Sequence, residues 1–301
     1  MKIIRSRYAG ACYGVERALS LVNEAMCTNA SPVYTLGPLI HNPQVVEELR
    51  QRGVEEVRAV AEVDEGVLVI RSHGVAPAII EQAHRKNLEV VDATCPHVSR
   101  AQKAARNLYE QGHLVVVVGE PEHPEVESIC AWAGNNALVA QEPSDLPEFL
   151  GSSSGGTSSS AATNNDDPTD GNPANGRIGV VAQTTQTPEA FDAIVDALQK
   201  RGIEPIVHNT ICLATRQRQE AAVELASAVD VMLVIGGKNS GNTTRLAKLC
   251  QAICPRTYHI EGTGELEASW FADTKVVGIT AGASTPENQI IAVEQALEQL
   301  S

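Results

Sequence analysis

Short apolar runs alternate along this chain with longer stretches that have the hydrophobic spacing of helices. After an apolar start at residues 3–4, the predicted strands are residues 33–35, 67–70, 88–91, 114–118, 178–181, 205–207, 231–235 and 276–279. Runs with few polar interruptions are typical of strands covered on both faces, as in parallel sheets. The alternation therefore predicts an α/β fold with mainly parallel sheets.

Residues 151–176 break this alternation. They contain Gly, Ser, Thr, Asn, Asp, Ala and Pro but no Val, Ile, Leu or aromatic residue. Such a segment cannot bury enough apolar area to offset the entropy lost on ordering, which predicts a disordered insertion. A linker between domains is the alternative, although we expect the strand at 178 to continue the sheet begun at 114.

The elements group into three small α/β domains. We expect the first at 13–95, the second at 96–208 with the insertion 151–176, and the third at 1–12 plus 209–301. Ligands of open α/β sheets bind beyond the carboxyl ends of the strands, and residues able to do chemistry follow nearly every predicted strand here. We expect these loops to face one central cavity.

Three cysteines occupy the same kind of local sequence. Cys12, Cys95 and Cys212 each follow a predicted strand and precede an Ala-rich helical stretch. The positive end of a helix dipole lowers the pKa of a thiol and favours the thiolate, the form that binds metal. The repeated context predicts convergence on one metal centre, and the alternative is that each cysteine is a small buried side chain.

Three thiolates without a matching fourth favour an iron–sulfur cluster with one iron left open for substrate. Zinc is the alternative, since three protein ligands plus water form a catalytic zinc site. The other four cysteines lie in or near helical stretches without metal-ligand spacing, so we assign them to core packing. They are Cys27, Cys130, Cys250 and Cys254.

A histidine and a carboxylate stand two residues apart at another strand-to-helix turn, His123 and Glu125. A carboxyl in a dry pocket beside a reduced cluster has a raised pKa, which makes Glu125 a candidate general acid. The alternative is that Glu125 and Glu127 only complement the helix dipole. His41 and His73, with His123, follow three strand ends and are candidates to hold a phosphate, although a loop histidine is often merely solvated.

Hydroxyl residues follow further strands. Ser240 and Ser284 are expected to cap helices, and an anion could bind at the same helix ends. Thr184 is a candidate either for a cap or for passing a proton to a substrate hydroxyl.

Charge and composition exclude some partners. The net charge is −14 over 301 residues, without the Lys and Arg clusters that nucleic acid requires. No apolar run reaches the ~20 residues of a membrane span, and the first residues lack a signal-peptide core. We expect a monomer in the cytoplasm, where thiols stay reduced.

Taken together, these motifs resemble the 4-hydroxy-3-methylbut-2-enyl diphosphate reductase family, the last enzymes of the methylerythritol phosphate route to isoprenoids. The resemblance covers nearly the whole chain. It is carried by Gly10-Ala11-Cys12-Tyr13-Gly14-Val15, Ile40-His41-Asn42, Ser72-His73-Gly74-Val75, Asp92-Ala93-Thr94-Cys95-Pro96, His123-Pro124-Glu125-Val126-Glu127, Gln183-Thr184-Thr185, Cys212-Leu213-Ala214-Thr215, Lys238-Asn239-Ser240 with Asn242, and Ala281-Gly282-Ala283-Ser284.

The resemblance implies a pseudo-threefold trefoil of three α/β domains around a 4Fe–4S cluster bound by Cys12, Cys95 and Cys212. It also implies that the fourth iron takes the substrate hydroxyl, that Glu125 supplies protons, and that Thr184 supports the hydroxyl. Ferredoxin or flavodoxin is the implied electron donor. The residues implied to hold the diphosphate are His41, His73, His123, Ser240, Asn242 and Ser284.

Gly241 departs from the pattern, because many relatives carry a second serine there, and a backbone amide or water is expected to take over that contact. Two alternatives to a reductase stay open. One is a quinolinate synthase-like dehydratase, which also uses a three-cysteine cluster, and the other is a cluster-based sensor, which has no use for Glu125.

Overall fold

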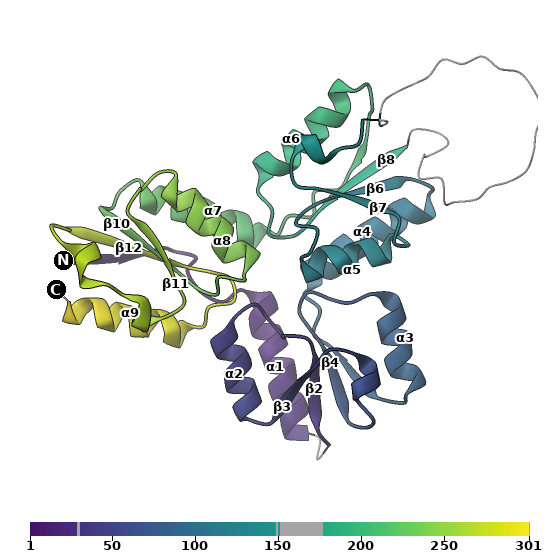
Figure 1. Cartoon of the computed structure of the whole chain (residues 1–301), viewed down its shortest axis with the longest axis horizontal. Coiled ribbons are helices and arrows are strands. Elements are labelled where there is room, and N and C mark those ends of the chain that lie inside the picture. Colours follow the sequence, from purple (N-terminus) through teal and green to yellow (C-terminus); the bar gives the residue numbers. More distant parts are fainter. Residues whose placement is uncertain (29–30, 149, 151–176, 301) are drawn as a thin grey trace, which may run out of the picture. The chain divides into compact units, whose positions relative to one another are not determined.

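The residues that the structure describes form three parallel sheets. The computed structural model describes residues 1–28, 31–148, 150 and 177–300, so the predicted insertion 151–176 lies outside the described residues. Each sheet has four strands, all strand pairs are parallel, and helices connect the strands (Figure 1). The predicted α/β class with parallel sheets is confirmed.

The chain divides into two compact units. The first consists of Met1–Ser99 and Ile211–Ser301 and contains two of the sheets, whereas the second consists of Arg100–Thr210 and contains the third. The three domain boundaries expected from the sequence stay a prediction, as do the trefoil arrangement and the central cavity.

The first sheet of the larger unit has the order β3-β2-β4-β5. Its elements are α1 (Tyr13–Thr28), β2 (Val33–Leu36), α2 (Pro43–Gln51), β3 (Val54–Val57), the 3-10 helix η1 (Val60–Glu62), β4 (Val67–Ile70), α3 (Pro77–Arg85) and β5 (Glu89–Asp92).

The second sheet of this unit has the order β1-β12-β10-β11. Its elements are β1 (Lys2–Arg5), α7 (Leu213–Ala226), β10 (Val231–Ile235), α8 (Gly241–Gln251), β11 (Thr257–Ile260), the 3-10 helices η4 (Thr263–Glu265) and η5 (Ala268–Phe271), β12 (Val276–Ala281) and α9 (Glu287–Gln299). The N-terminal strand thus pairs with β12, far away in the sequence.

The smaller unit contains the third sheet, with the order β7-β6-β8-β9. Helix α4 leads into it from the larger unit. Its elements are α4 (Pro96–Glu110), β6 (Leu114–Val118), α5 (Pro124–Trp132), β7 (Ala137–Ala140), the 3-10 helix η2 (Pro143–Asp145), β8 (Ile178–Ala182), α6 (Pro188–Lys200) and β9 (Ile206–Val207).

The strands that the apolar pattern missed are β3, β7 and β11. All three are edge strands, and each includes half-buried or exposed residues. An edge strand needs no continuous apolar run, because part of its surface faces water. The inner strands β4, β6, β8 and β10 are buried along their whole length and match the predicted runs.

The three sheets repeat one strand order, and this repetition positions the candidate site. Each sheet has an edge strand that leads into one of the cysteines. Strand β5 leads into Cys95, β1 into Cys12 and β9 into Cys212. The loops after the next two strands carry the remaining candidate residues. Because the carboxyl ends of parallel strands share one edge of a sheet, residues distant in the sequence become neighbours there.

None of the helices in the described ranges combines the length and the apolar character that crossing a membrane requires.

Candidate functional site

Cys12, Cys95 and Cys212 each lie directly before the first residue of a helix, as the sequence predicts. Each cysteine carbonyl accepts a hydrogen bond from the amide four residues later, at 3.0 Å for Cys12, 2.9 Å for Cys95 and 3.2 Å for Cys212. All three thiols are free and partly exposed. The repeated strand, turn, cysteine and helix therefore gives three sulfurs the same local setting.

The larger unit brings these thiols close together. A Cβ atom placed on Gly14 would stand 2.6 Å from Cys95 Sγ and 3.8 Å from Cys12 Sγ, so both sulfurs border the same backbone position. Negative charge on Cys12 or on Cys212 raises the pKa of the Cys95 thiol, so the Cys212 thiol lies within electrostatic reach of Cys95. Sulfurs from three distant parts of the sequence thus meet within one unit.

Burial has a larger effect on Cys95 than the helix does. It raises the pKa of the Cys95 thiol to about 11, although hydrogen bonds from the backbone of His97 and Val98 lower it. The predicted lowering of this pKa is therefore wrong for Cys95, because desolvation outweighs the helix N-terminus. A metal centre would have to displace this proton, since the thiolate is the ligand form.

The donor set fits a soft, polynuclear centre. Among the described residues no three His, Cys, Asp or Glu side chains are grouped closely enough to hold a single metal ion, which gives the zinc alternative no support. A four-iron cluster is itself several ångströms across, so its ligand sulfurs stand further apart than those around one ion. Three free thiols, two of which border the Gly14 backbone, suit such a cluster.

Gly14 gives a test of this arrangement. We expect Gly14→Ala to lower iron affinity about tenfold or more, because the added methyl group displaces the Cys95 sulfur, a loss of the size seen when residues supporting a metal site change. Iron and sulfide content per chain measures the effect. Gly264→Ala is the control, since nothing lies within 4 Å of a Cβ atom there, and equal iron content in both variants would contradict the arrangement.

Two of the cysteine loops are tied to loops that carry predicted substrate ligands. The Cys12 amide donates to the Ala283 carbonyl at 2.9 Å, next to Ser284, and the Cys95 amide donates to the Ser72 carbonyl at 2.9 Å, next to His73. The thiols and these polar residues therefore form one continuous region at the strand ends of the larger unit.

His41, His73 and Ser284 lie together in this region. The two imidazole rings have centroids 4.1 Å apart, and Ser284 Oγ donates to the His41 carbonyl at 2.9 Å. The loops after β2 and β4 bring in the histidines, and the loop after β12 brings in the serine. Imidazole and hydroxyl donors at helix ends suit an anionic ligand.

Asn42 joins these loops, a role that the sequence analysis did not assign. Its Nδ2 donates to the Ser284 carbonyl at 2.9 Å, and its Oδ1 accepts the amides of Gln44 and Val45, which caps α2. An asparagine directly before a proline at the start of a helix is a recognisable N-cap signal. The contact with Ser284, by contrast, joins residues 242 apart in the sequence.

Ser240, Gly241 and Asn242 begin helix α8 beside this region. Ser240 Oγ accepts the Thr243 amide at 3.4 Å, so the predicted cap is present. Asn242 is 5% exposed, and both of its side-chain polar atoms are buried without a hydrogen-bond partner in the described part of the chain. Buried polar groups are normally satisfied, so this amide is available to a ligand.

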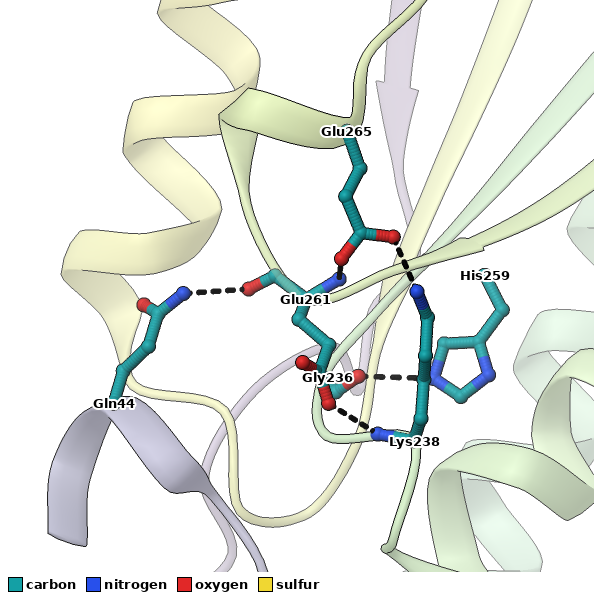
Figure 2. A network of polar contacts seen from close by, with 6 residues as sticks. All are labelled: Gln44, Gly236, Lys238, His259, Glu261 and Glu265. Atoms are coloured by element: carbon teal, nitrogen blue, oxygen red, sulfur yellow. Dashed lines mark hydrogen bonds and ion pairs between the residues drawn. The ribbon is translucent and has the colours of Figure 1, made fainter. Parts of the chain in front are cut away.

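The loop before Ser240 is fastened by a polar network (Figure 2). The Glu261 carboxylate accepts a hydrogen bond from the Lys238 amide at 2.7 Å. The Glu261 backbone carbonyl accepts one from Gln44 Nε2 at 3.0 Å. The Lys238 ammonium in turn contacts Glu265 at 2.5 Å. Because Gln44 lies just after His41 and Asn42, the network holds the loop after β2 and the loop after β10 together.

Glu125 and Thr184 meet in the smaller unit. Glu125 is 2% exposed, and its two carboxylate oxygens accept the Thr184 amide at 2.6 Å and the Thr184 hydroxyl at 3.0 Å. The contact forms because β6 and β8 are neighbours, so the loops that follow them adjoin. Glu125 is thus more than a solvated helix-terminal acid, whereas Glu127 on the same helical turn is exposed.

His123 caps helix α5 in the same unit. Its Nδ1 accepts the Glu125 amide at 3.1 Å, so a neutral ring carries its proton on Nε2, which is then a donor. The predicted residues are therefore divided between the two units. His41, His73, Ser240, Gly241, Asn242 and Ser284 lie with the three cysteines, and His123, Glu125 and Thr184 lie together in the other unit.

Known proteins share both the fold and the sequence. A chain from Geotalea uraniireducens (strain Rf4), 4-hydroxy-3-methylbut-2-enyl diphosphate reductase, is 44% identical over 301 residues, covering 100% of this chain and 98% of the relative. The reductase of the same name from Trichlorobacter lovleyi is 43% identical over 301 residues, covering 100% of this chain and 99% of the relative.

Solved structures agree with these relatives. The structure of (E)-4-hydroxy-3-methyl-but-2-enyl diphosphate reductase, described as the terminal enzyme of the non-mevalonate pathway, aligns with a TM-score of 0.68 and 40% identity, covering 99% of this chain and 100% of that one. The E-1-hydroxy-2-methyl-but-2-enyl-4-diphosphate reductase of Plasmodium falciparum shares the fold, with a TM-score of 0.84, 23% identity and coverage of 99% and 87%.

The parallel sheets, the polar strand ends and these relatives define the class of the protein as an oxidoreductase. Residues 3–298 match the family model of the LytB protein. The chain belongs to the LytB protein family.

Proposed function

We propose that this chain reduces (E)-4-hydroxy-3-methylbut-2-enyl diphosphate to isopentenyl diphosphate and dimethylallyl diphosphate. The reaction consumes two electrons and two protons, breaks the bond between carbon and the terminal hydroxyl, and releases water. A 4Fe–4S cluster held by Cys12, Cys95 and Cys212 would supply electrons and a Lewis-acid site for the hydroxyl. The observation that carries the proposal is the meeting of these thiols beside the polar region of the same unit.

The diphosphate is held by local donors. The chain has a net charge of −14, so a basic surface field cannot attract an anion. Imidazoles, hydroxyls, the Asn242 amide and the helix N-terminus after Ser240 supply hydrogen bonds instead. In this proposal the ligands are His41, His73, His123, Ser240, Asn242 and Ser284, and the Gly241 amide replaces the hydroxyl that many relatives have there.

In this proposal Glu125 donates a proton, and Thr184 passes it to the substrate. Loss of a hydroxyl as water needs a proton on the leaving oxygen, and a carboxyl is a suitable donor. The 3.0 Å contact between Glu125 and the Thr184 hydroxyl gives a path by which a proton reaches the substrate hydroxyl through Thr184. The buried setting also keeps bulk water from this carboxyl.

The physiological partner in this proposal is a small one-electron carrier, ferredoxin or flavodoxin, and the protein works as a monomer in the cytoplasm. The −14 charge gives nucleic acid no basis for binding.

Asn242 tests the diphosphate site. We expect Asn242→Ala to raise KM for the allylic diphosphate about tenfold or more, because it removes a buried amide that has no hydrogen-bond partner among the described residues and can pair with the ligand. Steady-state kinetics under anaerobic conditions measure the effect. Asn288→Ala, at an exposed position of α9, is the control, and an unchanged KM for the Asn242 variant would count against this site.

An anaerobic assay with dithionite and a redox dye tests the reaction itself. We expect reductant to be consumed only when the allylic diphosphate is present. A dehydratase of the quinolinate synthase type would transfer no net electrons, and a sensor would show no turnover, so either result would overturn the proposed reaction.

A further inference from the structure

Helix α7, which begins after Cys212, carries a buried cation. Arg218 is 4% exposed, its Nη2 donates to the Gly10 carbonyl at 2.7 Å, and its Nη1 donates to the Ala214 carbonyl at 3.3 Å. Its Nε is buried without a hydrogen-bond partner in the part of the chain that the structure describes. The ion pairs found among the described residues do not include Arg218.

A buried guanidinium keeps its charge and needs a counter-charge. Arginine is effectively always protonated, and a buried ion without a partner is strongly unfavourable. Burial lowers the pKa of Arg218, whereas charge on Cys12 and Cys212 raises it. Its two hydrogen bonds place the guanidinium beside the turn before Cys12 and the helix start after Cys212, so negative charge on a centre held by these cysteines would act on it.

The same arginine fixes the loop that precedes Cys12. Gly10, whose carbonyl it binds, has a φ of +111°, a conformation that side chains rarely allow. Arg218 thus reaches from the helix after Cys212 to the turn before Cys12. Its two hydrogen bonds thus reach the carbonyl of Gly10, just before Cys12, and the carbonyl of Ala214, just after Cys212.

We propose that Arg218 is a positioning residue whose positive charge balances the thiolate ligands and raises the reduction potential of the cluster they hold. This inference rests on the cluster in the proposed function. Each electron that the cluster accepts adds negative charge, and a fixed cation in a poorly solvated region stabilises the reduced form more than the oxidised form.

Two substitutions separate charge from hydrogen bonding. Arg218→Gln keeps a donor for the Gly10 carbonyl but removes the charge, and Arg218→Lys keeps the charge. Arg216→Gln is the matched control, because Arg216 lies on the same helix with 55% of its side chain exposed and faces Glu220 at 3.6 Å.

The measurement is a redox titration of the anaerobically purified holoenzyme, followed by electron paramagnetic resonance of the cluster. At a fixed potential we expect Arg218→Gln to lower the ratio of reduced to oxidised cluster about tenfold, which corresponds to a midpoint about 59 mV lower for a one-electron couple. Arg218→Lys should stay within about twofold of the parent ratio, and Arg216→Gln should not change it.

An unchanged midpoint in Arg218→Gln with full iron content would overturn the inference. If Arg218→Gln does not retain iron, the iron content of Arg218→Lys tests the inference instead. Retention of iron in Arg218→Lys would support the need for a positive charge, and an equal loss of iron would contradict it. Failure of the proposed function is distinguishable, since the unaltered protein would then either lack a cluster signal or titrate normally while consuming no reductant when the allylic diphosphate is added.

Discussion

Replacing Glu125 by glutamine is expected to lower turnover of the allylic diphosphate by about 10²- to 10⁴-fold, the usual contribution of a general acid. Glutamine is nearly the same size but cannot release a proton to the Thr184 hydroxyl, which lies 3.0 Å from the carboxylate. The cysteines belong to the other unit, so visible absorption and iron content should persist. Anaerobic turnover, normalised to iron content, measures the effect.

Glu127→Gln is the control for this prediction. Glu127 lies on the same first turn of α5, but it is exposed. If both residues only complemented the helix dipole, the two substitutions would reduce activity equally and slightly. Full activity in Glu125→Gln would remove Glu125 from the mechanism and mean that another group supplies the proton.

Thr184→Val is expected to have a smaller effect than Glu125→Gln. The Thr184 hydroxyl is lost, but the backbone amide at 2.6 Å still holds the Glu125 carboxylate in place. Turnover should fall because the proton path is broken, while the proton donor itself remains. A larger loss than in Glu125→Gln would mean that Thr184, and not Glu125, is the principal proton donor.

Replacing Cys95 by serine is expected to abolish most of the visible absorption of the cluster. The iron content per chain should fall with it, because one of the three sulfur ligands is lost. Serine keeps a similar volume but is a hard donor that iron–sulfur clusters rarely accept in place of thiolate. Iron and sulfide analysis with visible spectroscopy measures the loss.

Cys130→Ser is the matched control. Burial raises the pKa of the Cys130 thiol to about 11, as it does for Cys95, so the two thiols are protonated to a similar extent at neutral pH. They differ in their surroundings, because charge on Cys12 and Cys212 acts on the Cys95 thiol, whereas Cys130 packs against the hydrophobic core cluster of the smaller unit, which includes Ala101 and Val115. Bleaching by Cys130→Ser with an intact cluster in Cys95→Ser would refute the ligand assignment.

The sequence by itself determined the local elements. Continuous apolar runs such as 114–118 specify strands covered on both faces, and a turn with a cysteine followed by an Ala-rich stretch specifies a helix start. The edge strand β11 was missed because its first three residues are only half-buried and it has no apolar run. The pattern of apolar residues along the sequence indicates which segments are buried, and edge strands are the least buried strands of a sheet.

Arg218 shows a signal that was present but not used. Thr215, Arg218, Gln219 and Ala222 follow the i, i+3, i+4, i+7 spacing of a buried helical face, and all four are buried. A charged residue at a core position of that face indicates a buried counter-charge. That this side chain reaches the turn before Cys12 from the helix after Cys212 required the tertiary structure.

The tertiary structure decided which strand ends adjoin. Nothing in the local sequence states that β1 pairs with β12, that β6 pairs with β8, or that Asn42 binds the Ser284 carbonyl. Those pairings depend on contacts between distant segments, whose free energy is shared by the whole core and is not encoded in a short window. The sequence therefore identified the reactive residues of each loop separately. Which of these loops are neighbours was decided by the order of the strands in the sheets.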